Sequence, residues 1–315
     1  MALLEAKPAS STTSVFKTGN LSIKCISVEP SNTTSPPKAL LIVTPTIAGT
    51  YPILLFLHGT LLSNRSYTML LEHISSHGFI IVAPQLYGII PPSGHEEIKS
   101  VAAVRDWLST DLQSLLPENV QANLLQLALA GHSRGGKTAF NLAVLDHSNA
   151  TTAIRFSALI GIDPVAGPKK GSQIAPAILT YVPQSFELGI PVMVLGTDLG
   201  QRKKYAVLPP CAPEGVSHEE FFSECKPPCC HFVTKDYGHM DMLDDFSFDN
   251  IGASIGSLVC EGGKRPRGDM RRCVGGIVVA FLRAYLENNI RDLKTILDEP
   301  DISPVKLDPI KFIEA

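Results

Sequence analysis

The sequence predicts an α/β fold in which a mainly parallel central sheet is covered by helices on both faces. Strand-like runs that are short and apolar alternate with helix-like runs from about residue 39 to residue 285. Such short apolar runs are typical of strands buried on both faces of a parallel sheet. Apolar residues make up 44% of the 315 residues, which is enough for the sizeable core that this fold requires.

The composition and charge exclude several classes of protein. Charged residues make up 18% of the chain, too few for a disordered protein. The formal net charge of −3 gives no basic footprint for DNA or RNA, so we expect no nucleic-acid partner. No apolar run approaches the roughly 18 residues that span a bilayer. We therefore expect a protein that is soluble or in peripheral contact with a membrane.

The first 37 residues are expected to form a flexible leader, and residues 38–315 a single domain. The leader is rich in Ser and Thr, ends at Pro36-Pro37 and lacks the apolar segment of a secretory signal. Its first 20 residues contain one acidic residue, Glu5, which is weakly typical of a plastid transit peptide. The same 20 residues contain no Arg, and this favours the disordered leader of a cytosolic protein.

Each element of the alternation is located by its apolar residues and by the residues that end it. The first helix is expected to stop at Gly78, and the strand after it to end at Pro84. The expected strands cover residues 39–43, 53–58, 79–83, 124–130, 157–162, 192–195 and, more weakly, 231–234, and the expected helices cover residues 67–77, 98–116, 136–145 and 274–285.

Two stretches interrupt this alternation, residues 87–96 and residues 200–228. Both should lie near the carboxyl edge of the sheet, where open α/β sheets bind ligands. Each is a candidate lid or pocket wall. For the first stretch a solvated surface loop is an equal alternative, whereas the Cys, Pro and aromatic residues of the second favour compact order.

The most informative motif is the pentapeptide Gly131-His132-Ser133-Arg134-Gly135. A strand-like run precedes it and a helix-like run that starts with small residues follows it. This context predicts the nucleophile elbow of the α/β-hydrolases, a strained turn that lifts a serine to the top of the sheet. The alternative is an incidental Gly-rich helix N-terminus, because the pentapeptide also occurs by chance.

A serine hydroxyl needs a base, and in these hydrolases the base is a histidine further along the chain. His239 follows the last expected strand in a Gly-His loop, which can place an imidazole above the sheet, so it is the favoured base. His231 and His218 are the alternatives. His147 lies in the tail of the elbow helix and cannot fold back to Ser133.

The acid that orients the histidine has two candidates, because Asp163 and Asp198 each end an expected strand. The residues alone leave both open, with a slight preference for Asp198 on the later strand. The oxyanion hole needs two backbone N–H groups. We expect one N–H group from Arg134, directly after the serine. The other is expected from Thr60 or Leu61, in the loop where Gly59 permits a tight turn.

Histidines and cysteines elsewhere in the chain suggest no metal centre. His58 and His132 are expected to be structural, and the pair His73 and His77 lacks the glutamate of a zinc-protease motif. Four of the seven cysteines are Cys211, Cys225, Cys229 and Cys230. Their spacing fits a zinc site poorly, which leaves a local disulfide or, favoured in a reducing compartment, free thiols.

These residues lie within longer stretches that resemble the plant chlorophyllases, a family of α/β-hydrolases. The resemblance covers most of the chain from about Pro37 onward. The matching stretches are LFLHGT (55–60), SHGFIIVAPQLY (76–87), GHSRGGKTAF (131–140), LIGIDPVAG (159–167), CAPEGVSHEEFF (211–222), FVTKDYGHMDMLDD (232–245) and MRRCVGGIVVAFL (270–282).

The resemblance implies hydrolysis of the ester that joins phytol to the chlorophyll macrocycle, through a Ser-His-Asp triad and an acyl-enzyme. It implies the triad Ser133, Asp163 and His239, because the family's acid lies in the segment that matches residues 161–167. Asp198 and His231 remain the fallback members. No cofactor and no metal is expected, since the magnesium belongs to the pigment.

The resemblance also implies chlorophyll as the partner, peripheral contact with the membrane that holds it, and a chloroplast location. The leader is the part least similar to the family, so the cytosol or another endomembrane surface is the alternative. Two other functions stay open. One is a carboxylesterase or lipase that acts on simpler lipid esters, and the other is a hydrolase-fold receptor for a small ligand.

Overall fold

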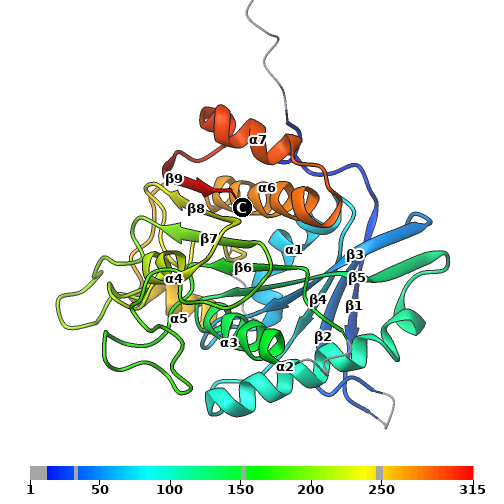
Figure 1. The fold of residues 1–315 in the computed structure, drawn as a ribbon, viewed down its shortest axis with the longest axis horizontal. Helices are drawn as coiled ribbons and strands as arrows, with labels where there is room; N and C mark the ends of the chain where they lie inside the picture. Colours follow the sequence, from blue (N-terminus) through cyan, green and yellow to red (C-terminus); the bar gives the residue numbers. More distant parts are fainter. Residues whose placement is uncertain (1–12, 32–34, 150–153, 246–250, 315) are drawn as a thin grey trace, which may run out of the picture.

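A computed structural model describes residues 13–31, 35–149, 154–245 and 251–314. A nine-stranded sheet in the order β1-β2-β4-β3-β5-β6-β7-β8-β9 forms the centre of the molecule (Figure 1). The strands from β4 to β8 in this order are parallel, and β1, β2 and β9 pair antiparallel at the two edges. The strands are β1 (Ile23–Val28), β2 (Leu40–Pro45), β3 (Gly49–Leu57), β4 (Ile80–Pro84), β5 (Val120–His132), β6 (Ala158–Ile162), β7 (Val192–Thr197), β8 (Cys229–Thr234) and β9 (Leu307–Ile313).

Helices cover both faces of this sheet (Figure 1). One face carries α1 (Thr68–Ser75), α6 (Arg267–Leu286) and α7 (Arg291–Asp298), whose apolar side chains share one core cluster. The other face carries α2 (Gly94–Leu108), α3 (Arg134–Ser148) and α4 (His218–Glu224), which share a second cluster. The short helix α5 (Ile251–Val259) follows β8 and lies near the carboxyl edge of the sheet.

Strand β3 shows why the expected strands are apolar throughout. Leu54 and Phe56 pack into the core with α1 and α6, whereas Ile53, Leu55 and Leu57 pack into the core with α2 and α3. Successive side chains of a strand point to opposite faces. A sheet covered on both faces therefore requires apolar residues at every position, and the predicted two-sided α/β architecture is confirmed.

The four expected helices all differ from the structure at their ends, and α6 begins at Arg267 rather than at residue 274. The first helix spans Thr68–Ser75, and the chain turns away at Gly78, whose φ of +102° suits glycine. The second begins four residues earlier than expected, at Gly94, because Ser93 and Glu96 form a capping box ahead of the apolar residues. It ends at Leu108 rather than residue 116, and Leu112–Leu115 form a separate 3₁₀ turn.

The leader contains structure that the sequence analysis did not expect. Residues Ile23–Val28 form the edge strand β1, and Val15 and Phe16 are buried against α6. The expectation of a flexible leader is therefore wrong for these residues, because an edge strand needs few apolar side chains to pair with its neighbour. Residues 1–12, the first part of the candidate transit segment, lie outside the described residues. In the described part of the chain, every helix is too short or too polar to cross a bilayer.

Candidate active site

Ser133 occupies the sharp corner between β5 and α3. Its φ of +55° and ψ of −125° are strained for a residue with a side chain. The two flanking glycines make this corner sterically possible. A Cβ on Gly131 would lie 2.3 Å from the carbonyl oxygen of Gly135, and a Cβ on Gly135 would lie 2.5 Å from that of His58. The strand and the helix therefore pack in contact, and Ser133 is held at the top of the sheet.

His239 and Asp163 come to Ser133 from the ends of two other strands. His239 lies five residues after β8, and its Nε2 is 2.8 Å from the Ser133 hydroxyl oxygen. Its Nδ1 is 2.7 Å from Oδ2 of Asp163, the residue directly after β6. Ser133 is 9% exposed, His239 4% and Asp163 0%. A linear chain of polar groups thus runs from a buried carboxylate to a hydroxyl at the surface of a cavity.

The environment of Asp163 keeps its carboxylate ionised. Burial raises its pKa, but the hydrogen bond and charge of His239 and a hydrogen bond from Thr197 outweigh burial and lower the pKa to about 2. Thr197 donates its hydroxyl to Oδ2 at 2.6 Å and its amide to Oδ1 at 3.2 Å. An ionised Asp163 must receive the Nδ1–H of His239, which leaves Nε2 free to accept the proton of Ser133.

The loop that carries His239 is fastened by Asp241. Its Oδ2 accepts the amide of Gly238 at 2.7 Å and that of Gly263 at 2.6 Å. The second bond ties the His239 loop to the chain that follows α5. The position of the His239 imidazole is therefore fixed by hydrogen bonds between the Asp241 carboxylate and the backbone, in addition to packing.

The amides expected to bind an oxyanion lie on both sides of Ser133. Arg134 is the first residue of α3, so its N–H has no partner within the helix. Thr60 lines the same cavity as Ser133 and lies next to Gly59. A Cβ on Gly59 would lie 3.1 Å from the Ser133 Cβ, so this loop touches the serine. Leu61 continues the turn with a φ of +62°.

Tyr67 and His132 connect these two halves of the site. The amide of Gly59 donates to the Tyr67 hydroxyl at 3.0 Å, and that hydroxyl lies 2.8 Å from Nδ1 of His132. Nε2 of His132 lies 3.0 Å from the backbone carbonyl of His239. Because the carbonyl can only accept, Nε2 donates and Nδ1 accepts from Tyr67. The network links the Thr60 loop to the His239 loop beneath Ser133.

His58 lies next to this network and is neutral. Its Nδ1 donates to the carbonyl of Gly59 at 2.9 Å, and its Nε2 accepts the amide of Leu86 at 3.0 Å. Burial lowers its pKa to about 4. Both histidines that were expected to be structural therefore hold backbone segments around the site.

The fallback residues lie away from Ser133. Asp198 pairs with Lys235 at 3.0 Å and Arg202 at 3.7 Å. His231 lies inside β8, and its Nε2 is 2.9 Å from Nδ1 of His218. Burial lowers the pKa of His231 to about 3. Asp198 follows a strand as Asp163 does, but β6 lies beside the elbow strand β5 whereas β7 is one strand further away.

The side chain of Arg134 contributes contacts that the sequence analysis missed. Its guanidinium donates to the buried carboxylate of Glu97 at 2.7 Å and to the carbonyl of Pro92 at 2.7 Å. It also lies over the ring of Tyr87 at 5.7 Å. Arg134 thereby anchors the 87–96 stretch beside the elbow. Within the described chain, no residue of that stretch lines the cavity; residues 87–93 form a loop next to the site, and residues 94–96 begin α2.

The cavity above Ser133 has a volume of about 270 Å³ and a mainly apolar lining. The second candidate wall stretch, residues 200–228, does contribute to it. Helix α5, which the sequence analysis did not identify, forms another side, although its apolar run ASIGSLV was a visible signal. The lining residues include Thr60, Leu61, Leu62, Val165, Ile174, Pro209, Pro210, Cys211, Pro213, Met240, Ile255, Val259 and Cys260.

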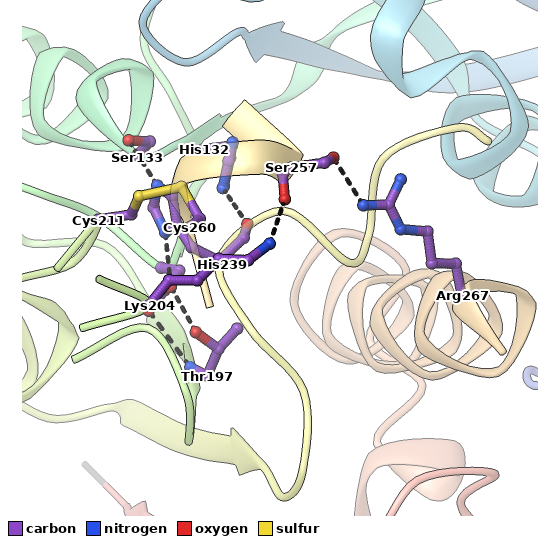
Figure 2. The surroundings of a disulfide bond; sticks show 10 residues. His132, Ser133, Thr197, Lys204, Cys211, His239, Ser257, Cys260 and Arg267 are labelled. Carbon is purple, nitrogen blue, oxygen red and sulfur yellow. Dashed lines mark hydrogen bonds and ion pairs between the residues drawn. A yellow bond between two sulfur atoms is a disulfide. The ribbon is translucent and has the colours of Figure 1, made fainter. Parts of the chain in front are cut away.

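A disulfide joins Cys211 to Cys260 in the wall of this cavity (Figure 2). The expectation of free thiols is wrong for this pair, and the partner of Cys211 is not one of its neighbours. The two cysteines are 49 residues apart, and only the fold brings their loops together. The other five, Cys25, Cys225, Cys229, Cys230 and Cys273, are free. Among the described residues, no group of His, Cys, Asp or Glu side chains is arranged to hold a metal ion.

The order Ser, Asp, His along the chain, on a mainly parallel sheet with the serine at a strand–helix corner, places this protein among the α/β-hydrolases. The family model described as chlorophyllase matches residues 11–314. Chlorophyllase-1 of Arabidopsis thaliana is 48% identical over 100% of this chain and 98% of its own length. Chlorophyllase-2 of the same plant is 50% identical over 88% of this chain and 87% of its own length. A protein of Citrus unshiu named "chlorophyllase-1, chloroplastic" is 46% identical over 100% of this chain and 96% of its own length. The chain belongs to the chlorophyllase family.

Proposed function

We propose that this chlorophyllase cleaves the phytyl ester of chlorophyll to chlorophyllide and phytol through an acyl-enzyme formed on Ser133. The proposal depends chiefly on one observation, the contact of the two His239 ring nitrogens with the Ser133 hydroxyl and the Asp163 carboxylate. The Ser133 oxygen attacks the ester carbonyl carbon while Nε2 of His239 takes its proton. Asp163 stabilises the imidazolium that forms.

The oxygen of the attacked carbonyl becomes negatively charged in this step. The amides of Arg134 and Thr60 are its proposed partners, and each donor contributes on the order of 10²–10³-fold to the rate. The imidazolium then protonates the departing phytol oxygen, and the ester bond breaks. Water, deprotonated by His239, attacks the acyl-enzyme and releases chlorophyllide, which restores Ser133.

The cavity favours an apolar ester. Its volume of about 270 Å³ is just below the roughly 300–1,000 Å³ of ordinary ligand pockets. It can enclose the ester and the atoms near it, but not a tetrapyrrole and a C20 chain together. We infer that the rest of the pigment lies across the mouth of the cavity and that the protein makes peripheral contact with the membrane from which the pigment comes.

A plastid location and a single catalytic domain complete the proposal. The location is supported by the name of the Citrus unshiu relative, which includes "chloroplastic". The domain covers residues 38–315 together with the edge strand β1 (Ile23–Val28), because β1 completes the sheet edge. A transit role for residues 1–12, which precede the buried Val15 and Phe16, remains part of this proposal.

The test compares chlorophyll with short p-nitrophenyl esters as substrates of the parent chain and of Ser133→Ala. We expect the parent chain to release chlorophyllide, and the variant to lose on the order of 10⁶-fold in kcat. Turnover of the short esters alone would identify a general carboxylesterase. Ligand binding without turnover of any ester by the parent chain would identify a receptor.

A further inference from the structure

Exposed apolar side chains gather around the mouth of the active-site cavity. We define them as the rim patch, and they follow the carboxyl ends of β3, β7 and β8. Leu61 and Ile255 belong to the patch and also line the cavity, so the patch and the cavity are continuous. Val207 is 89% exposed and Leu258 64%. The rim patch consists of Leu61, Tyr205, Val207, Leu208, Ile255 and Leu258.

The two segments that supply most of the patch are fastened to each other. Lys203 and Cys260 form a β-bridge, and the ammonium of Lys204 donates to the carbonyl of Ser257 at 2.8 Å (Figure 2). The disulfide between Cys211 and Cys260 adds a covalent link. The apolar tips are therefore presented on a braced surface rather than on two independent loops.

Basic residues flank the apolar tips on both segments. Arg202, Lys203 and Lys204 precede the first tip, and Lys264 and Arg265 follow the second, and all five are exposed. The acidic residues nearby are fewer. Glu214, Asp236 and Glu261 carry negative charge, and Asp198 is paired with Lys235 and with Arg202, one of the five basic residues. This edge is locally positive although the whole chain has a net charge of −3.

We propose that the rim patch docks on the surface of an anionic lipid bilayer, with its apolar tips in the headgroup region and the cavity mouth facing the lipid. Basic and apolar side chains side by side are the combination that binds anionic membranes. A second copy of the chain fits the patch less well, because two positive rims would face each other. The inference rests on the proposed function, because docking in this orientation lets the phytyl chain of chlorophyll enter the cavity directly from the bilayer.

The experiment measures binding of the Ser133→Ala chain to sedimented vesicles, so that turnover does not interfere. We expect binding to vesicles that contain phosphatidylglycerol and weak binding to phosphatidylcholine alone. Combining Val207→Glu with Leu258→Glu should lower the vesicle partition coefficient by about 10-fold or more. Combining Lys203→Gln with Lys264→Gln should lower it by about 30-fold, because each basic residue near an anionic surface contributes about 1 kcal/mol.

Leu125→Glu is the matched control, since Leu125 is 88% exposed but lies in the N-terminal half of β5, away from the carboxyl edge of the sheet. It should bind vesicles as the parent chain does. The proposal is overturned if the parent binds no anionic vesicle, or if the rim and control variants behave alike. It is also overturned if the parent is a dimer that the rim variant dissociates, since a second copy then covers the patch.

Failure of docking and failure of the proposed function give different results. Val207 and Leu258 do not line the cavity, so the double variant with Ser133 intact should hydrolyse a water-soluble short ester and detergent-dispersed chlorophyll at the parental rate. Unchanged vesicle binding with intact hydrolysis overturns docking alone. A parent chain that hydrolyses no ester in detergent overturns the proposed function, whatever its vesicle binding.

Discussion

At the residue scale, the site depends on which of two aspartates reaches the histidine. Asp163 and Asp198 both follow a parallel strand, and both carry a pKa lowered from the ordinary value. They differ in partner. Asp163 faces an imidazole and a hydroxyl in a fully buried position, whereas Asp198 faces Lys235 and Arg202 near the surface.

Asp163→Asn should lower kcat by about 10⁴-fold, because an amide cannot hold His239 in the tautomer that accepts the serine proton. Asp198→Asn removes a partly exposed ion pair and should leave kcat within a few-fold of the parent. The measurement is steady-state chlorophyll hydrolysis by both variants. Equal losses of kcat in the two variants, or a larger loss for Asp198→Asn, would show that Asp163 is not the acid of the triad.

Tyr67 is expected to act as a positioning residue. Tyr67→Phe leaves the Gly59 amide and Nδ1 of His132 without their partner in a buried place. We expect a loss of about 1–3 kcal/mol in the free energy of unfolding. We also expect kcat to fall while KM changes little, because the network holds the Thr60 and His239 loops and does not face the substrate.

Tyr51→Phe is the control for this prediction, since the Tyr51 hydroxyl only donates to the carbonyl of Ile47 at the surface, at 3.0 Å. It should leave both quantities unchanged. If Tyr67→Phe lowers stability but keeps the parental kcat, Tyr67 has a purely structural role.

At the element scale, the wall of the cavity is formed by a loop after β7 and by α5, which the disulfide between Cys211 and Cys260 joins. Neither segment belongs to the central sheet. A cross-link over a separation of 49 residues restricts the unfolded chain, and loop-closure entropy predicts a stabilisation of about 4 kcal/mol.

Cys260→Ser should therefore lower the free energy of unfolding by about 4 kcal/mol in urea denaturation. Reduction of the parent chain by dithiothreitol should have the same effect. Cys25→Ser, which changes an exposed free thiol, is the control and should unfold as the parent does. A parent chain whose unfolding is insensitive to the reductant would show that the two loops are not cross-linked.

The elements themselves could be predicted to different degrees from the sequence. Central strands such as β3 and β6 were predictable because burial on two faces leaves an uninterrupted apolar run. The edge strand β1 has the sequence IKCISV, in which half-buried and exposed residues are mixed, and Ser- and Thr-rich segments surround it. Its hydrophobic pattern alone therefore could not distinguish it from a leader. The helix α2 begins at a capping box formed by Ser93 and Glu96. This local sequence signal predicts the true start of the helix better than the first apolar residue, Ile98, does.

The candidate site was predictable as far as chain-local signals reach. Ser133 was identified from its flanking glycines, and His239 from its position after a strand. Asp163 could not be separated from Asp198, because that choice depends on strand order, a long-range property of the sheet. The same holds for Cys260 as the partner of Cys211, and for the contact of Tyr67 with His132, which lie 65 residues apart.

At the scale of the whole molecule, buried neutral histidines make stability depend on pH. The pKa values of His58 and His231 are lowered to about 4 and about 3 from the ordinary 6.5. Their contribution to the free energy of unfolding is therefore complete above pH 6.5 and is lost as the pH falls. Between pH 7 and pH 5, the contribution of each histidine to the free energy of unfolding falls by about 2 kcal/mol. Asp244 has the opposite sign, because burial raises its pKa to about 6, and it regains about 1 kcal/mol over the same interval.

The free energy of unfolding should therefore be lower at pH 5 than at pH 7, by a few kcal/mol. Urea denaturation at the two values measures this difference. His58→Gln, if it folds, should have a smaller difference than the parent, because the titrating group is gone. Equal or greater stability at pH 5 would contradict the assignment of these histidines as neutral in the folded protein.

The central claim is that the hydroxyl of Ser133 is the nucleophile and that His239 activates it. A fluorophosphonate tests this directly, because an activated serine displaces fluoride and keeps the phosphonyl group, which mass spectrometry locates on a peptide. We predict a stoichiometric adduct on Ser133 in the parent chain and in Asp198→Asn, and none in His239→Ala. An adduct on another serine, or equal labelling of Ser133 in the absence of the imidazole, would contradict the account.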